Sequence, residues 1–248
     1  MIDIFEKYRT AVEETDPIKY TGVVSRVRGM LIESNGPQAV VGEICQIILS
    51  RGHKPVFAEV VGLSGTTVQL MSYADVGGIE IGCMVIASGS VLSVPVGDML
   101  LGRVLDSLGK SADDREEIVS PVHYPVLASP PDPMKRRPIE DRIVTGVRAI
   151  DSLLAVGKGQ RLGIFAGSGV GKSTLLGMIA RNTNADINVI ALIGERGREV
   201  VDFIRNDLGP DGLKRSVVVA ATSDQSPLSR IRGAYVATAV AEYFRDQG

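Results

Sequence analysis

The stretch RLGIFAGSGVGKST, residues 161–174, decides which fold the sequence predicts. A short apolar run, typical of a buried strand, leads into a glycine-rich turn, and the pattern of 173–182 then predicts a helix. The consensus phosphate-binding loop is G-x-x-x-x-G-K-[ST]. Ala166 stands at its first glycine, and Gly171, Lys172 and Ser173 match the rest. The stretch therefore predicts a nucleotide-binding loop between a strand and a helix, the alternative being a glycine-rich turn that serves packing alone.

The residue types of this loop suit a phosphate group. Glycines let successive backbone N–H groups turn toward one anion, and the helix that follows points its positive N-terminal end at the same place. We expect Lys172 to reach the β- and γ-phosphates of ATP and the Ser173 hydroxyl to complete the ligand shell of Mg²⁺. The predicted nucleotide-binding residues are Ala166, Gly167, Ser168, Gly169, Val170, Gly171, Lys172, Ser173 and Thr174.

Residues 145–248 alternate apolar runs with helical patterns. The runs NVIALIG (188–194) and SVVVAAT (216–222) follow the first one, with a helical pattern between them and another after them. Such alternation predicts an α/β domain with a largely parallel sheet, whose ligands bind at the carboxyl ends of the strands. We expect Asp224 or Gln225 to cap the last helix, which begins near Pro227.

The chain before this domain divides into three parts. Residues 20–95 hold six short runs rich in valine and isoleucine between turn residues, which predicts a small antiparallel β-barrel. Residues 96–144 predict a connector, with a helix-like piece at 98–109 followed by a linker that holds half of the 12 prolines. Residues 1–19 predict an amphipathic helix that either docks on the body of the protein or binds a partner.

Composition excludes several other classes of protein. The 248 residues are 44% hydrophobic with a net charge of −2 and no tryptophan, which argues against disorder and against nucleic-acid binding. Two cysteines and two histidines are too few for a metal site built from those residues. The acidic start and the lack of a long apolar run predict a cytoplasmic protein without a signal peptide.

Several separated motifs resemble one family in the same order. They are KGQRLGIFAGSGVGKSTLLGMIARN (158–182), ALIGERGREVVDFI (191–204) and VVAATSDQSPLSRIRGAYVATAVAEYFRDQG (218–248). Together they resemble the rotary ATPase family, and within it the export ATPases of flagella and type III secretion systems. The resemblance implies a β-barrel followed by a RecA-like nucleotide domain. It also implies that this chain corresponds to the N-terminal half, before the strand that carries the Walker B aspartate.

The resemblance assigns roles to Glu195 and Arg196, which follow the run 188–194. A carboxylate at the end of a strand faces the phosphate side of the sheet, where it can orient the attacking water. From position alone, surface ion pairs with Arg198 and Glu199 remain the alternative. By the resemblance, Glu195 is the catalytic carboxylate and Arg196 lies near the γ-phosphate, so that the predicted catalytic residues are Lys172, Glu195 and Arg196.

The resemblance also implies partners and a location. It implies a homo-hexamer in which a neighbour's arginine completes each site, and a stator-like regulatory protein bound at the N-terminal helix. It implies contact with an export gate, export substrates and their chaperones, at the inner face of the cell membrane and peripheral to it. The alternatives are the catalytic subunit of an F- or V-type ATP synthase, a noncatalytic nucleotide-binding regulator and, of a different class, an RNA-dependent helicase.

Overall fold

The computed structural model describes residue 9 and residues 19–50, 53–136, 138–167 and 169–248, which form two compact units, Met1–Val91 and Leu92–Gly248. Apart from Arg9 and Lys19, the predicted helix at 1–19 lies outside the described residues. No helix among the described residues is long and apolar enough to cross a membrane.

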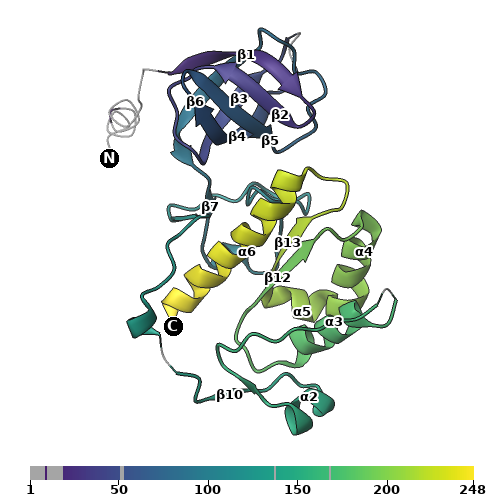
Figure 1. Cartoon of the computed structure of the whole chain (residues 1–248). Helices are drawn as coiled ribbons and strands as arrows, with labels where there is room; N and C mark the ends of the chain where they lie inside the picture. The colour runs from purple at the N-terminus through teal and green to yellow at the C-terminus, as the bar shows by residue number, and fades with distance from the viewer. Residues whose placement is uncertain (1–8, 10–18, 51–52, 137, 168) are drawn as a thin grey trace, which may run out of the picture. The chain divides into compact units, whose positions relative to one another are not determined.

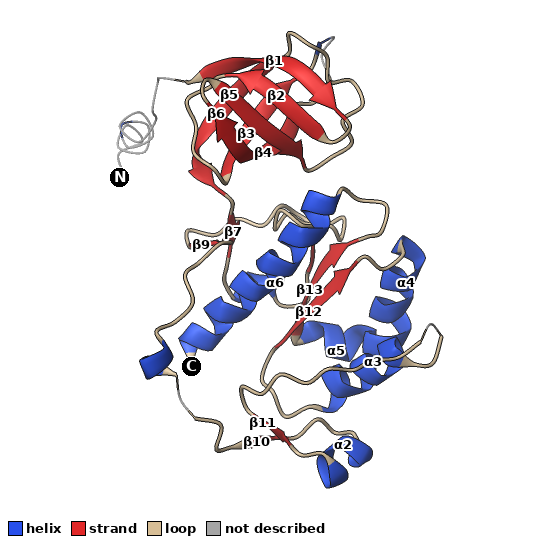
Figure 2. Cartoon of the chain, in the orientation of Figure 1, coloured by secondary structure: helices blue, strands red, loops and turns tan. Residues whose placement is uncertain are grey.

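The first unit is a closed six-stranded barrel in which every pair of neighbouring strands is antiparallel (Figures 1 and 2). Its strands follow the order β1-β2-β5-β4-β3-β6 around the barrel, which closes every edge. Apolar side chains alternate along the strands because every second residue points inward. The predicted barrel is therefore confirmed. The strands are β1 Thr21–Arg28, β2 Leu31–Asn35, β3 Glu43–Ile48, β4 Val56–Ser64, β5 Thr67–Ser72 and β6 Met84–Val91.

A buried carboxylate ties the loop before β3 to strand β6. Glu43 is buried, and its two oxygens accept hydrogen bonds from the backbone N–H groups of Val40 (3.0 Å) and Gly89 (2.8 Å). The neighbouring inward side chain is Cys45, a free thiol whose pKa is raised to about 12, mainly by burial and further by the charge of Glu43.

The second unit is an α/β structure around a short parallel sheet. The sheet has the order β12-β13-β8, with strands Asn188–Ile193, Ser216–Ala221 and Val104–Leu105. Alternate residues of β13 point to opposite faces. Val217 and Val219 pack with the long helix α6 (Pro227–Gln247), and Val218 belongs to the apolar cluster on the other face.

The helices of that second face begin with α3 (Lys172–Asn182), which follows the phosphate-binding loop (Figure 2). After β12 the chain turns helical again, as α4 (Gly197–Asp202), a π-helical segment η4 (Phe203–Leu208) and α5 (Gly209–Lys214). The π-helical segment lies against α3. A Cβ added at Gly177 of α3 would lie 2.6 Å from the backbone oxygen of Asp207, so only glycine permits this approach.

Two predicted elements are wrong. Residues 161–167 form no strand, because none of the described strands offers them a backbone ladder, and Phe165 is 97% exposed. Residues 98–109 form no helix beyond a single turn, η2 (Asp98–Leu100). Gly102 has a φ of +78°, which is incompatible with an α-helix, and Val104–Leu105 join the sheet beside β13.

The proline-rich connector contains only short elements, as its composition predicts. Besides η2 and the strand at Val104–Leu105, it holds one helical turn, η3 (Pro133–Lys135), and the short strands β9 (His123–Pro125) and β10 (Arg142–Ile143). The short strand β7 (Ser93–Pro95) precedes it, and the short helix α2 (Arg148–Leu153) and the strand β11 (Val156–Gly157) follow it.

An ion pair fixes the start of the connector to the sheet. Arg103 donates from Nε to Asp113 Oδ2 (2.8 Å) and from Nη2 to Asp113 Oδ1 (3.0 Å), with side chains only 13% and 10% exposed. The backbone N–H of Val104, the first residue of β8, also donates to Asp113. Burial by itself would raise the pKa of Asp113, but the hydrogen bonds from Arg103, Ser111 and Val104 outweigh it and hold that pKa far below the ordinary carboxyl range.

Candidate functional site

The glycine-rich loop turns into α3 through left-handed backbone. Gly169 and Gly171 have φ values of +76° and +93°, and Gly171 is the N-cap residue just before the helix. Residues with a Cβ rarely adopt these values, which explains glycine at both positions. A Cβ placed at Gly167, Gly169 or Gly171 would meet no atom within 4 Å, so these three glycines border open space.

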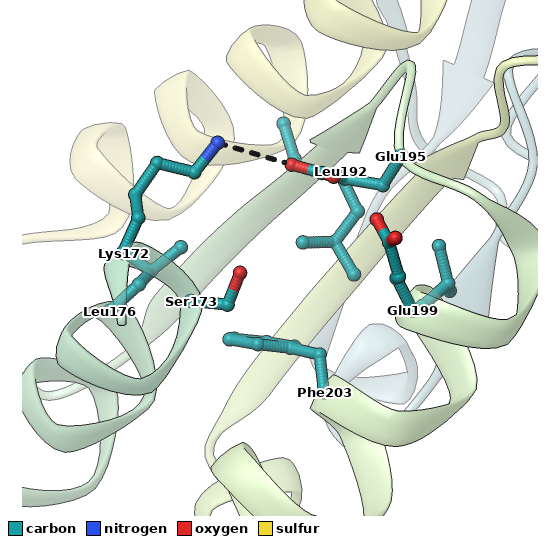
Figure 3. A pocket seen from close by; sticks show the side chains of 9 residues that line it. Lys172, Ser173, Leu176, Leu192, Glu195, Glu199 and Phe203 are labelled. Carbon is teal, nitrogen blue, oxygen red and sulfur yellow. Dashed lines mark hydrogen bonds and ion pairs between the residues drawn. The ribbon is translucent and has the colours of Figure 1, made fainter. Parts of the chain in front are cut away.

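Lys172 and Ser173 occupy the first turn of α3, at the positive end of the helix. The Lys172 side chain extends toward the end of β12, where its Nζ lies 3.4 Å from Glu195 Oε1 (Figure 3). The two residues are 23 positions apart in the sequence, and the fold brings them to one place.

A pair of backbone hydrogen bonds positions Glu195 at the carboxyl end of the sheet. β12 ends at Ile193, and the N–H of Gly194 donates to the carbonyl of Ala221, the last residue of β13, at 2.7 Å. The N–H of Ser223 then donates to the Glu195 carbonyl at 2.9 Å. The turn after β12 is thus fixed to the end of β13, which places the carboxylate where parallel sheets bind their ligands.

These side chains line a pocket of about 160 Å³ (Figure 3). Polar groups from α3, from the turn after β12 and from α4 face an apolar wall that includes the buried Phe203, the first residue of the π-helical segment. The lining residues are Lys172, Ser173, Leu176, Ala191, Leu192, Glu195, Glu199, Val200 and Phe203.

The structure gathers only part of the predicted site into this pocket. Lys172, Ser173 and Glu195 line it. Ser168 lies outside the described residues. The other predicted residues are described but do not line the pocket: Ala166, Gly167, Gly169, Val170, Gly171, Thr174 and Arg196.

Glu199 is a charged residue of the pocket lining that the sequence analysis did not predict. It lies on α4, and its Oε1 pairs with Arg196 Nη1 at 3.2 Å, the surface pair that position alone left open. Burial acts to raise the pKa of Glu199, but hydrogen bonds from the backbone and side chain of Arg196 lower it below the ordinary value. Its spacing could have predicted this place, because Glu199 follows Glu195 by four residues, which is about one turn of a helix that begins beside the site.

The residues before α6 differ from the prediction. Ser226, rather than Asp224 or Gln225, caps the helix, and its Oγ accepts a hydrogen bond from the Ser229 N–H at 3.1 Å. Asp224 is instead hydrogen-bonded to the Thr222 side chain, which lowers its pKa. Neither residue lines the pocket.

The donor set fits a nucleotide together with Mg²⁺. Mg²⁺ prefers hard oxygen ligands and is usually bound by one or two carboxylates together with substrate phosphates. The pocket offers the Ser173 hydroxyl and the carboxylates of Glu195 and Glu199. Among the described residues, no group of three or more acidic, histidine or cysteine side chains is placed to hold a metal by itself.

Comparison with known proteins matches both units to one family. Residues 24–89 match the beta-barrel domain of the ATP synthase alpha/beta family, and residues 146–248 match its nucleotide-binding domain. The flagellum-specific ATP synthase of Treponema pallidum is 65% identical over 246 residues, a match that covers 99% of this chain and 55% of that protein. The type 3 secretion system ATPase of Xanthomonas euvesicatoria is 51% identical, with 92% of this chain and 51% of that protein covered.

A solved structure gives the same result. The assembled ATPase EscN from the enteropathogenic E. coli type III secretion system is similar with a TM-score of 0.83 and 42% identity, covering 92% of this chain and 54% of that one. The chain thus spans about half the length of the relatives it matches. Since both domain models match in order and export ATPases align over nearly all of its residues, the chain belongs to the ATP synthase alpha/beta family, in its branch of flagellar and type III export ATPases.

Proposed function

We propose that the protein hydrolyses ATP at this pocket and that hydrolysis drives flagellar or type III protein export. The observation that carries the proposal is the convergence of Lys172 and Glu195, which come from the loop helix and from the end of β12 and lie 3.4 Å apart. Transfer of a phosphoryl group to water uses a cation that binds the phosphate oxygens and, next to it, a carboxylate that orients the attacking water and accepts its proton.

Each residue has a proposed role. The loop 166–174 holds the phosphates through its backbone N–H groups and the end of α3. Lys172 binds the β- and γ-phosphates, and Arg196 lies near the γ-phosphate. Ser173 is the side chain that would hold Mg²⁺, which neutralises phosphate charge when bound. Glu195 orients the attacking water and accepts its proton.

The proposal includes an oligomer and a regulatory partner. The similar protein EscN has been seen assembled, and also in complex with its central stalk EscO. For this protein we propose a homo-hexamer whose sites are completed by a neighbour's arginine, and a regulatory partner at residues 1–19. We propose that the protein acts at the inner face of the membrane as a peripheral protein. We also propose three domain boundaries: a barrel at 20–95, a connector at 96–144 and a nucleotide domain at 145–248.

Two substitutions separate binding from turnover. We expect Lys172→Ala to abolish ATP binding, because the loop loses its phosphate cation, and Glu195→Gln to keep binding while phosphate release stops. The matched control is Lys214→Ala, which removes a lysine of α5 that pairs with the exposed Asp211 and does not line the pocket. Binding measured by calorimetry and phosphate release measured in the intact protein test this assignment. If Glu195→Gln lost ATP binding as fully as it lost phosphate release, the proposed role of Glu195 would be contradicted.

The same measurements address the noncatalytic alternative. A regulatory nucleotide-binding protein would retain ATP stoichiometrically and release no phosphate in its unsubstituted form. Steady phosphate release that depends on both Lys172 and Glu195 would exclude it.

A further inference from the structure

An apolar strip lies on the outer face of the barrel and crosses three neighbouring strands. Met84 of β6 is paired with Val23 of β1 on one side and with Ile48 of β3 on the other. Ile86, two residues further along β6, points to the same face. Val23 and Met84 are 49% and 43% exposed, and the two isoleucines are half-buried. Single exposed apolar side chains are common on proteins, but four that adjoin in register form a continuous patch of the kind that another surface covers.

The strip adjoins the point at which the chain enters the barrel. The N–H of Ala87 donates to the carbonyl of Tyr20 at 3.0 Å, so the residue before β1 is already fixed beside β6. Val23 follows three residues later, about 10 Å along the strand. Residues 1–18 are joined to this point through Lys19. The apolar strip therefore lies within a few residues' reach of that segment, which meets it at a high effective concentration.

The sequence of residues 1–18 suits an apolar surface. Its apolar residues repeat at helical spacing on one face: Ile4, Phe5, Tyr8, Ala11 and Val12. Arg9, the one residue of this segment that the structure describes, is helical and exposed. A helix over residues 4–16 would be about 20 Å long, and the strip spans two spacings between strands, about 10 Å, so two turns of the helix suffice to cover it.

We propose that residues 1–18 dock on this strip of their own barrel, with the apolar face of the predicted helix over Val23 and Met84. Docking removes the apolar surface of both elements from water, which stabilises the contact. The short connection favours the chain's own barrel over that of another molecule. The inference does not rest on ATP hydrolysis. It adds that a regulatory partner at residues 1–19 has to release this segment from the barrel before binding it.

Limited proteolysis of the intact chain measures the docking. Trypsin cuts after Lys7 and Arg9 only in molecules whose segment has left the barrel, so the cleavage rate follows the population of the released form. We expect Met84→Ser to speed this cleavage about tenfold, which corresponds to about 1.4 kcal/mol of lost apolar contact.

The matched control is Leu63→Ser, which removes an apolar side chain of similar exposure, 48%, from the β4–β5 hairpin. Neither strand of that hairpin borders β1 or β6, so the control should leave the cleavage rate unchanged. Equal cleavage rates in the unsubstituted protein, Met84→Ser and Leu63→Ser would overturn the proposal.

Cysteine cross-linking identifies what covers the strip. Tyr8→Cys is combined with Met84→Cys, or with Leu63→Cys as the control, and the intact protein is oxidised mildly. We expect the first pair to form a disulfide within one chain, found as a linked peptide pair in the monomer band, and the control pair to form none. The native Cys45 and Cys83 are buried, and the single variants measure their background. Disulfide-linked dimers would show that another copy covers the strip and would overturn the proposal, as would the absence of any disulfide between the first pair.

Discussion

Replacement of Arg103 by methionine tests how far one ion pair holds the connector to the sheet. The substitution keeps the length of the side chain and removes the cation, which leaves the Asp113 carboxylate only 10% exposed and without its bidentate partner. Removing one member of a buried pair costs about 3–5 kcal/mol, and we expect about 3 because both side chains retain some exposure. The loss falls on β8, since Val104 N–H donates to Asp113 and Val218 N–H donates to the Arg103 carbonyl.

The pH dependence distinguishes an electrostatic effect from a packing effect. The folded-state pKa of Asp113 lies below its unfolded value of about 3.9, so its stabilisation is complete above that pH and is lost as pH falls through the folded pKa. In Arg103→Met the carboxyl loses its strongest partner but keeps Ser111, Val104 and Arg115, so the pKa of Asp113 rises toward its ordinary value. The deficit of the variant should therefore be full at pH 7 and shrink toward pH 3.5, as the carboxyl of the variant takes up a proton before that of the unsubstituted protein.

The assay is the rate of amide hydrogen exchange in peptides that contain β8 and β13, because this rate reports the stability of the sheet separately from that of the barrel. About 3 kcal/mol corresponds to roughly a hundredfold faster exchange at Val104 and Val218. Adding Asp113→Asn to Arg103→Met should restore most of the protection, since the buried charge is then gone. A deficit below about 0.5 kcal/mol, typical of a surface pair, or one that is equal at both pH values would refute the reasoning.

Three further predictions concern packing, thiol chemistry and capping. Gly177→Ala should lower the free energy of unfolding by about 1–3 kcal/mol, because its Cβ would meet the Asp207 backbone at 2.6 Å, and urea denaturation that is unchanged would contradict this. Cys45 should stay unreactive toward a disulfide reagent at pH 8 and react on unfolding, because burial and Glu43 keep its thiol protonated; rapid reaction in the folded protein would count against that environment. Ser226→Ala should cost about 1 kcal/mol and Ser226→Asp much less, as measured by thermal unfolding, because the cap of α6 needs a side-chain oxygen; an equal loss in both would show that the cap is not responsible.

The features that sequence reasoning predicted correctly are those whose physical cause is local. The barrel strands follow from alternating apolar residues between turns, and α3 follows from a glycine-rich loop with a helical pattern behind it. The helix predicted at 98–109 failed because a local apolar pattern does not show that Val104 and Leu105 pair with a strand more than a hundred residues later. The strand predicted at 161–167 failed for the same reason, since a strand needs a neighbour for its backbone.

By itself, the sequence determined the phosphate-binding loop, its lysine and serine, and the carboxylate after β12, because these groups are specified by residue type and by spacing along one stretch of chain. Only the tertiary structure decided that Lys172 and Glu195 meet at 3.4 Å and that Glu199 shares their pocket. The physical reason is that these distances depend on how the turn after β12 is fixed to the end of β13 by two backbone hydrogen bonds. Contacts between segments so far apart leave no periodicity in the sequence from which they could be predicted.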